Sequence, residues 1–383
     1  MIKLLVDSIL DAVNVTIKLT KQTFNIESDN KFKAKELEEF FLAIDLKNKN
    51  LVENNTPRLV QILEQSDKLD KFILSNPYLN ISSFKEKEEQ FKSYLESKLV
   101  KFEYNYNNKN IIVTSYKELM KDSYNFKYVK CLDYEFFGGY NLVEEECIFN
   151  LRRNMLISGS VGQGKTSTLQ GILLNRIWNN RNNENCIGTD INIIDLKGTD
   201  LVYFKDIKEV ENIAINTEQA KEVLLKLKEE MENRNKIFRN KKVSSIEDYN
   251  EISKIKMRYK YLVIDELATF QELEKKEKEE INNIFLTLAS KSRSTGIIII
   301  AATQRPDSKT LDSFIKAQLS GCIIGHKVNN KHTSEVIINK EGLENLVNPG
   351  QAIIVGSKEE ITQFPYISTK ELKVRLKKDL NKY

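Results

Sequence analysis

Cysteine and histidine are scarce in this chain of 383 residues. The four cysteines lie far apart and form no C-x-x-C pair: Cys131, Cys147, Cys186 and Cys322. This spacing argues against a disulfide framework and indicates free thiols in a reducing cytosol. His326 and His332 have no third ligand nearby, so we expect no metal site built on histidine.

Long hydrophobic runs are also missing. The longest, near residues 297–302, is far shorter than the roughly 18 residues that a membrane-spanning helix needs. The N-terminal apolar stretch is broken by Asp7 and Asp11 and has no small-residue cleavage site, which predicts an amphipathic helix and not a signal peptide. We therefore expect a cytoplasmic protein, or one attached to a membrane only through a partner.

A strong excess of one charge is absent as well. With a net charge of +4, affinity for a polyanion must come from local basic clusters. The densest cluster lies in residues 234–242, and its candidates for DNA contact are Arg239, Lys241 and Lys242. Lys309 and Lys316 are weaker candidates of the same kind. A solvated basic face is the alternative for all five.

What the chain does contain is a glycine-rich loop that fits G-x-x-x-x-G-K-[ST] without a mismatch. A short apolar strand precedes it and a helical pattern follows, which is the context that a phosphate-binding loop requires. Lys165 can reach the β- and γ-phosphates of a nucleotide, and the hydroxyl of Thr166 can bind Mg²⁺. A chance Gly-rich turn is the alternative. The predicted ATP-binding residues are Gly159, Ser160, Val161, Gly162, Gln163, Gly164, Lys165, Thr166 and Ser167.

Two adjacent acids end a later apolar strand, residues 260–264. Asp265 is the predicted Mg²⁺ partner and Glu266 the predicted general base that activates water. Such a strand end is a weak signal alone, because many strands end in acids. It gains weight because it follows the glycine-rich loop by about 100 residues.

Two further polar residues flank the next apolar strand, residues 296–302. Gln304 follows it, and an amide there can sense the γ-phosphate or position water. The alternative is a capping turn closed by Pro306. Arg293 precedes the strand at a predicted helix end, where the helix dipole alone would favour a cation.

The order of the apolar runs predicts the architecture. Residues 1–70 have helical spacing, 71–127 predict a small α+β module with a hairpin near 101–116, and 128–383 alternate apolar runs with helical stretches. That alternation predicts an α/β domain with a mostly parallel sheet flanked by helices on both faces. Its strands are expected at 155–157, 191–196, 261–264, 297–302, 322–324 and 352–355.

Several motifs in one order resemble the FtsK/SpoIIIE family of DNA-translocating ATPases. They are GSVGQGKTS at 159–167, IIDLKGTDL at 193–201, EEMENRNKIF at 229–238, YLVIDELA at 261–268 and KSRSTGIIIIAATQRPD at 291–307. The resemblance implies a RecA-like P-loop core, a hexameric ring around double-stranded DNA, and translocation driven by ATP with Mg²⁺. It implies Lys165, Glu266, Gln304 and Arg293 as catalytic residues, with Arg293 reaching the neighbouring subunit.

The layout departs from the chromosome-partitioning members, because neither membrane spans nor a C-terminal winged helix is evident. It is most similar to the FtsK-type coupling proteins of Gram-positive conjugative elements. We therefore expect a motor that moves plasmid, transposon or phage DNA, with a relaxase or a membrane-transfer protein as partner. Two alternatives stay open: a secretion-system ATPase that pumps protein, and an ATP-switched DNA-binding accessory protein of replication.

Overall fold

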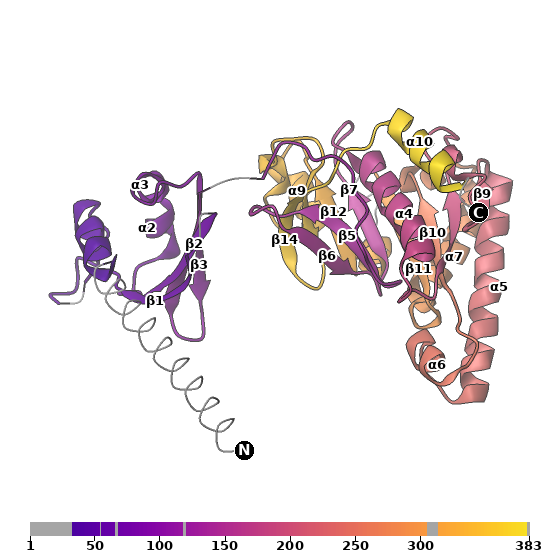
Figure 1. Ribbon diagram of the computed structural model, residues 1–383, viewed down its shortest axis with the longest axis horizontal. Helices are drawn as coiled ribbons and strands as arrows, with labels where there is room; N and C mark the ends of the chain where they lie inside the picture. The colour runs from indigo at the N-terminus through magenta and orange to yellow at the C-terminus, as the bar shows by residue number, and fades with distance from the viewer. Residues whose placement is uncertain (1–32, 54, 66–67, 118–119, 305–312, 381–383) are drawn as a thin grey trace, which may run out of the picture. The chain divides into compact units, whose positions relative to one another are not determined.

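The computed structural model describes residues 33–304 and 313–380, apart from 54, 66–67 and 118–119 (Figure 1). Its contacts divide the chain into two units, Met1–Leu119 and Met120–Tyr383. Most of the predicted helical N-terminal region, residues 1–32, lies outside the described part, as does Lys309. Within the described residues, no helix has the length and apolarity to cross a bilayer.

The first unit is an α+β module. Its antiparallel sheet has the order β1-β2-β4-β3 and packs against three short helices. The predicted hairpin is confirmed, since β3 and β4 pair from Leu99 with Tyr116 to Asn105 with Asn110. The elements are a helix over residues 33–43, β1 (Leu59–Gln65), β2 (Leu69–Leu74), α2 (Ile81–Lys85), α3 (Glu88–Tyr94), β3 (Leu99–Asn105) and β4 (Asn110–Tyr116).

Strand β1 corrects the helical prediction for residues 59–65. Its pairing with β2 shifts register twice, between Leu59 and Gln61 and between Ile62 and Glu64. Each such bulge adds a residue and breaks the two-residue alternation of side chains. Leu59 and Ile62 are therefore both half-buried although they lie three positions apart, a spacing that is typical of a helix.

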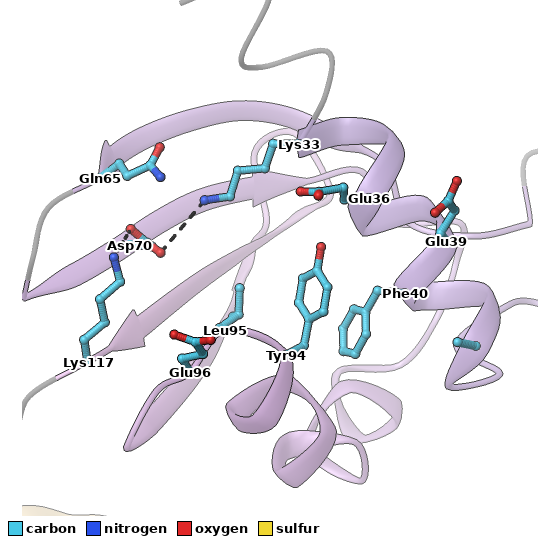
Figure 2. Close-up of a pocket in the computed structure, with 11 residues that line it drawn as sticks. Lys33, Glu36, Glu39, Phe40, Gln65, Asp70, Tyr94, Leu95, Glu96 and Lys117 are labelled. Carbon is cyan, nitrogen blue, oxygen red and sulfur yellow. Dashed lines mark ion pairs between the residues drawn. The ribbon is translucent and has the colours of Figure 1, made fainter.

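A groove of about 760 Å³ lies in this module and contains a buried carboxylate (Figure 2). Asp70 on β2 lies 3.9 Å from the ammonium of Lys33 and 3.1 Å from that of Lys117. Phe40 and Tyr94 stack beside them with ring centroids 4.1 Å apart. These contacts tie the helix over residues 33–43 to the sheet and to α3.

The second unit is built on a ten-stranded sheet of order β6-β5-β14-β13-β12-β7-β11-β10-β8-β9. The six strands from β12 to β9 are parallel, and the four from β13 to β6 continue the sheet antiparallel. The strands are β5 (Glu135–Tyr140), β6 (Glu146–Asn150), β7 (Met155–Ser158), β8 (Thr189–Ile194), β9 (Val210–Ala214), β10 (Tyr259–Ile264), β11 (Ile297–Thr303), β12 (Cys322–His326), β13 (Gln351–Val355) and β14 (Glu359–Gln363).

Helices cover both faces of this sheet (Figure 1). One core contains side chains of α4 and α10, and the other contains side chains of α5, α7, α8 and α9. The helices are α4 (Lys165–Asn182), α5 (Thr217–Lys241), α6 (Ile246–Ile252), α7 (Lys275–Lys291), α8 (Ser313–Leu319), α9 (Lys331–Ile338) and α10 (Thr369–Leu380). The predicted α/β class with a mostly parallel, two-sided sheet is confirmed.

Helix α4, which begins at Lys165, is fixed by buried amide side chains. Asn175, Asn179 and Asn183 lie four residues apart and face one side of the helix. Asn175 and Asn179 accept hydrogen bonds of 2.9 Å from the backbone of residues 129 and 131, and Asn179 and Asn183 donate to the carbonyls there. An extended segment is thereby held against α4 with its buried polar groups satisfied.

A buried ion pair extends this anchor. The guanidinium of Arg176 lies 3.7 Å from the carboxylate of Asp133, and both side chains are buried. Asp133 also accepts hydrogen bonds from the backbone of Ile187 at 2.6 Å and of Gly188 at 3.0 Å. The end of α4 and the start of β8 are thus held by one carboxylate.

Candidate nucleotide-binding site

The glycine-rich loop runs from the end of β7 to the first turn of α4, as predicted. Gly164 lies directly before the helix with φ +104°, a backbone conformation that side-chain-bearing residues rarely adopt. The ammonium of Lys165 is folded back onto the carbonyls of Gly159 and Ser160, at 2.7 Å from each. Burial lowers the pKa of Lys165 to about 8, because loss of hydration disfavours the charged ammonium. A negatively charged ligand would offset this effect.

Two segments that are distant in sequence form backbone hydrogen bonds with the loop. The amide of Ser160 donates to the carbonyl of Lys327 at 2.9 Å, just after β12. The amide of Gly350 donates to the carbonyl of Gln163, also at 2.9 Å. A Cβ on Gly164 would lie 2.9 Å from the nitrogen of Gly350. The turn at 348–351 thus fits against the loop only because glycine stands at position 164.

His326, at the end of β12, fills the space beneath the loop. It is fully buried, and burial lowers its pKa to about 4, with the nearby charge of Lys165 acting in the same direction. Its Nδ1 lies 2.8 Å from the carbonyl oxygen of Gln351, and its Nε2 lies 3.2 Å from the hydroxyl of Thr168. In the neutral ring Nδ1 must therefore donate, so Nε2 accepts from Thr168. Nothing in the sequence marked this residue.

The two predicted acids meet the loop at the same edge of the sheet. β10, β11 and β7 are parallel neighbours, so their carboxyl ends lie side by side. Both oxygens of Glu266 accept from the amide of Gln304, each at 3.1 Å, and Oε1 also accepts from the amide of Ala268 at 3.3 Å. The charge of Glu266 acts on Lys165, where it opposes the effect of burial on the pKa.

Asp265 lies in an electrostatically costly position. It is 8% exposed, and burial raises its pKa to about 7, followed by repulsion from Asp200 and Asp195. Asp195 ends β8 and accepts from the amides of Gly198 and Asp200 at 3.0 Å and of Leu201 at 2.9 Å. Three carboxylates therefore converge near the loop.

Lys197 is a further basic residue of this edge. Its ammonium lies 3.8 Å from Oε2 of Glu266, and its charge lowers the pKa of both Asp265 and Lys165. It lies in the IIDLKGTDL stretch, where the sequence showed only a resemblance and no role. Because Asp195 folds the segment 195–201 around its carboxylate, the lysine that follows it faces the acids.

The structure places Arg293 away from this edge. It precedes β11, whereas the loop follows β7, so the two lie at opposite ends of parallel strands. The side chain is exposed. Arg293 therefore does not contact the loop of its own chain.

The DNA-contact candidates are divided among different places. Arg239, Lys241 and Lys242 are exposed at the C-terminal end of α5. Arg234 of the same run is instead buried and paired with Glu230 at 2.7 Å, so it does not belong to a basic surface.

Lys316, on α8, is half-buried and donates to Asn339 at 2.6 Å. It is thus held by a hydrogen bond within the domain, and Lys309 lies outside the described residues.

The parallel sheet, the glycine-rich loop between strand and helix and the carboxylates at the neighbouring strand end together define a P-loop nucleotide-binding protein. Within that class, residues 139–308 match the FtsK/SpoIIIE family model. This part of the chain is therefore similar to the family that the sequence motifs predicted.

Curated relatives are similar to part of this chain. The DNA translocase FtsK of Staphylococcus epidermidis is 26% identical over 281 residues, which cover 69% of this chain and 34% of the relative. The DNA translocase FtsK of Streptococcus agalactiae is 29% identical over 218 residues, which cover 54% of this chain and 26% of the relative. The chain thus spans about a third or less of the length of these relatives.

Solved structures have a similar fold. The pCW3 conjugation coupling protein TcpA, in monomer form with ATPγS, matches with a TM-score of 0.61 and 19% identity, covering 90% of this chain and 98% of that one. ATPases 2 and 3 of EssC from Geobacillus thermodenitrificans match with a TM-score of 0.57 and 19% identity, covering 67% and 50%. At these identities the matches confirm the fold class.

Proposed function

We propose that this chain is an ATP-driven motor that moves double-stranded DNA. The observation that carries the proposal is the convergence of Lys165, Asp265 and Glu266 at one sheet edge within the region that matches the FtsK/SpoIIIE family model. The curated relatives, which are named DNA translocases, support DNA as the substrate. The fold shared with a conjugation coupling protein supports plasmid, transposon or phage DNA as the cargo.

In this proposal, nucleotide binding first changes the hydrogen-bond partners of Lys165. Lys165 leaves the carbonyls of Gly159 and Ser160 and binds the β- and γ-phosphates, whose charge raises its pKa. The loop amides from residues 160–167 surround the phosphates at the N-terminus of α4.

Glu266 then takes a proton from the attacking water. The carboxylate is oriented by the amides of Gln304 and Ala268, which leaves it fixed at the end of β10. Because the backbone of Gln304 holds the base, a change in the segment after β11 would move the base with it. Gln304 thus acts as the proposed sensor through its main chain as well as its side chain.

The residues at this edge fit Mg²⁺. Among the described residues, no group of three or more His, Cys, Asp or Glu is arranged to hold a metal ion by itself. Burial and the neighbouring carboxylates of Asp200 and Asp195 raise the pKa of Asp265, so a bound cation would stabilise its ionised form. Thr166, half-buried in the first turn of α4, and Asp265 would hold the ion with the phosphates. When bound, Mg²⁺ neutralises charge that develops on the phosphates.

The proposal includes assembly into a ring, expected to be a hexamer, and the place of Arg293 supports it. An arginine at the far end of the sheet can stabilise a γ-phosphate only on a neighbouring copy. The exposed Arg239, Lys241 and Lys242, with Lys309 and Lys316, are the proposed DNA contacts. A cytoplasmic location and a relaxase or membrane-transfer partner stay predictions.

The test is ATP hydrolysis measured with duplex DNA, with single-stranded DNA and without DNA. We expect strong stimulation by duplex DNA that weakens steeply as salt rises. Lys165→Ala should abolish hydrolysis, whereas Lys226→Ala, an exposed lysine on α5, should leave it unchanged. An ATP hydrolysis rate that does not change when DNA is added would favour a secretion ATPase. Nucleotide binding without hydrolysis would favour the ATP-switched accessory protein. Full activity of Lys165→Ala would show that the site is wrong.

A further inference from the structure

Three arginines surround a cavity of about 330 Å³ at the start of β7, at the end of the sheet opposite to the phosphate loop. The cavity is lined by Arg152, Arg153 and Arg293, together with Asn150, Gly321 and Ser357. We call this cavity the arginine pocket. The resemblance to known translocases pointed only to Arg293; Arg152 and Arg153 come from the structure.

The positive charge of the pocket is largely uncompensated. Arg152 lies 3.5 Å from the carboxylate of Glu247 and stacks on Tyr134 at 4.0 Å from the ring centroid. Arg153 and Arg293 have no carboxylate within ion-pair distance among the residues that the structure describes. Guanidinium groups bind carboxylates and phosphates with paired hydrogen bonds, and a phosphate, which carries more than one negative charge, fits a site with several arginines.

The turn that carries Arg293 is rigid. The hydroxyl of Ser292 donates to the carbonyl of Ile297 at 2.8 Å, and that of Thr295 donates to the carbonyl of Ser292 at 2.6 Å. Behind the turn, the buried Arg234 donates to the carbonyl of Thr295 at 2.8 Å. The backbone at Arg293 is thus fixed before any ligand arrives, which lowers the entropy cost of binding.

Arg153 is held by close backbone packing. A Cβ on Gly321 would lie 2.2 Å from the Cβ of Arg153 and 2.9 Å from the carbonyl oxygen of Asn154. The absence of a side chain at position 321 therefore lets the arginine stem lie against the chain that enters β12. This contact fixes the base of the side chain, which lines the cavity.

The pocket cannot serve the nucleotide of its own chain. From Arg153 to Gly159 the chain runs along β7, and an extended segment of that length spans roughly 20 Å. A duplex would present a row of phosphates, which suits a basic stripe more than one compact cavity. A terminal phosphate, with its concentrated charge, suits three guanidinium groups around a single point.

We propose that the arginine pocket binds the terminal phosphate of the nucleotide held by a neighbouring copy of this chain, with Arg152 and Arg153 acting beside Arg293. This inference rests on the proposed function, because it needs copies that meet loop to pocket. It extends the predicted single finger to a three-residue site. Arg152 and Arg153 should then matter for turnover and leave nucleotide binding to their own loop unchanged.

The experiment compares the double variant R152Q/R153Q, the single variants R153Q and R153K, and K226Q as a surface control. We expect about a hundredfold loss of duplex-stimulated turnover in the double variant, below the 10³–10⁵-fold effect of a complete finger. R153K should lie between R153Q and the wild type, since it keeps the charge and loses the paired hydrogen bonds. Binding of a fluorescent ATP analogue and thermal unfolding, followed through Trp178, verify that each variant is folded.

Mixing separates a role in trans from other roles. Lys165→Ala subunits have a damaged loop and an intact pocket, so added to R152Q/R153Q they should restore turnover above the sum of the two proteins. No restoration, or wild-type turnover in the double variant, would overturn the inference. The inference would also be wrong if the double variant bound duplex DNA more weakly in the absence of nucleotide and mixing restored no turnover. The pocket would then be a DNA-binding site. A wild-type protein that binds ATP but never hydrolyses it would instead refute the proposed function.

Discussion

Replacing Asp265 by asparagine should stabilise the nucleotide-free protein while abolishing its activity. The pKa of Asp265 is raised from 3.8 to about 7, so the native state prefers the protonated acid. As pH rises from 3.8 to 7, the unfolded state releases this proton before the native state does, and stability is lost at about 1.36 kcal/mol per pH unit. Above pH 7 the loss levels off near about 4 kcal/mol, which relaxation at the site reduces.

Asparagine has no proton to lose, so its benefit should appear as pH rises. Between pH 5 and pH 8 we expect Asp265→Asn to gain about 2 kcal/mol over the wild type, which is about 4–8 °C in the unfolding midpoint of a domain this size. The assay is thermal unfolding without nucleotide, followed through Trp178. This residue is the single tryptophan of the chain and stacks on Tyr128 within the second unit.

The control is Asp206→Asn, which removes an exposed carboxylate. It should change the unfolding midpoint by the same small amount at pH 5 and at pH 8. An Asp265→Asn difference that is the same at pH 5 and pH 8 would refute the reasoning. So would a variant that is less stable than the wild type at pH 8. ATP hydrolysis by the variant should be undetectable, because the proposed Mg²⁺ partner is gone.

Three further predictions concern the frame of the site. Gly164→Ala should lower the free energy of unfolding by about 1–3 kcal/mol and weaken nucleotide binding, because φ is +104° and the new Cβ would meet Gly350. Denaturant unfolding and binding of a fluorescent ATP analogue measure these two effects. Asp133→Ala should cost about 3–5 kcal/mol by leaving the buried Arg176 without its carboxylate, again by denaturant unfolding. His326, with its pKa lowered from 6.5 to about 4, should make the wild type lose up to about 3 kcal/mol as pH falls between these values, since only the unfolded state takes the proton. His326→Gln should show a smaller loss when unfolding is measured at pH 7 and pH 5.

The parallel part of the sheet was predictable because each strand is buried on both faces and therefore appears as a short apolar run. All six predicted strands are present, but β13 among them is antiparallel, and the parallel edge strand β9 was not predicted. The pattern also did not give the order of the strands across the sheet. The antiparallel strands β5, β6 and β14 were not predicted, since their side chains mix apolar and polar residues. β1 was predicted as helix because a bulge between Leu59 and Ile62 gave these residues a three-residue spacing.

The loop and the acid pair were predictable because each is a local motif with its own chemistry. His326 and Gly350 were not, because they contact the loop across more than 150 residues of chain and have ordinary neighbours in sequence. The run 234–242 was interpreted as one basic cluster, yet helix α5 turns Arg234 inward and Arg239 outward. The four-residue spacing of the asparagines on α4 lets their side chains hydrogen-bond one extended segment, which composition alone did not suggest.

Burial at this site disfavours charge of both signs. Burial lowers the pKa of Lys165 and raises that of Asp265, so neither ion is stabilised enough by the other to offset its lost hydration. Lys165 compensates in part by binding the carbonyls of Gly159 and Ser160. Phosphates would supply the lysine with negative charge, and a divalent cation would supply the aspartate with positive charge. Binding a metal–nucleotide complex therefore relieves both costs at once, while either component alone relieves one and leaves the other. We infer that the protein is stabilised by the complex beyond the sum of its parts, which couples folding of the site to the substrate that it hydrolyses.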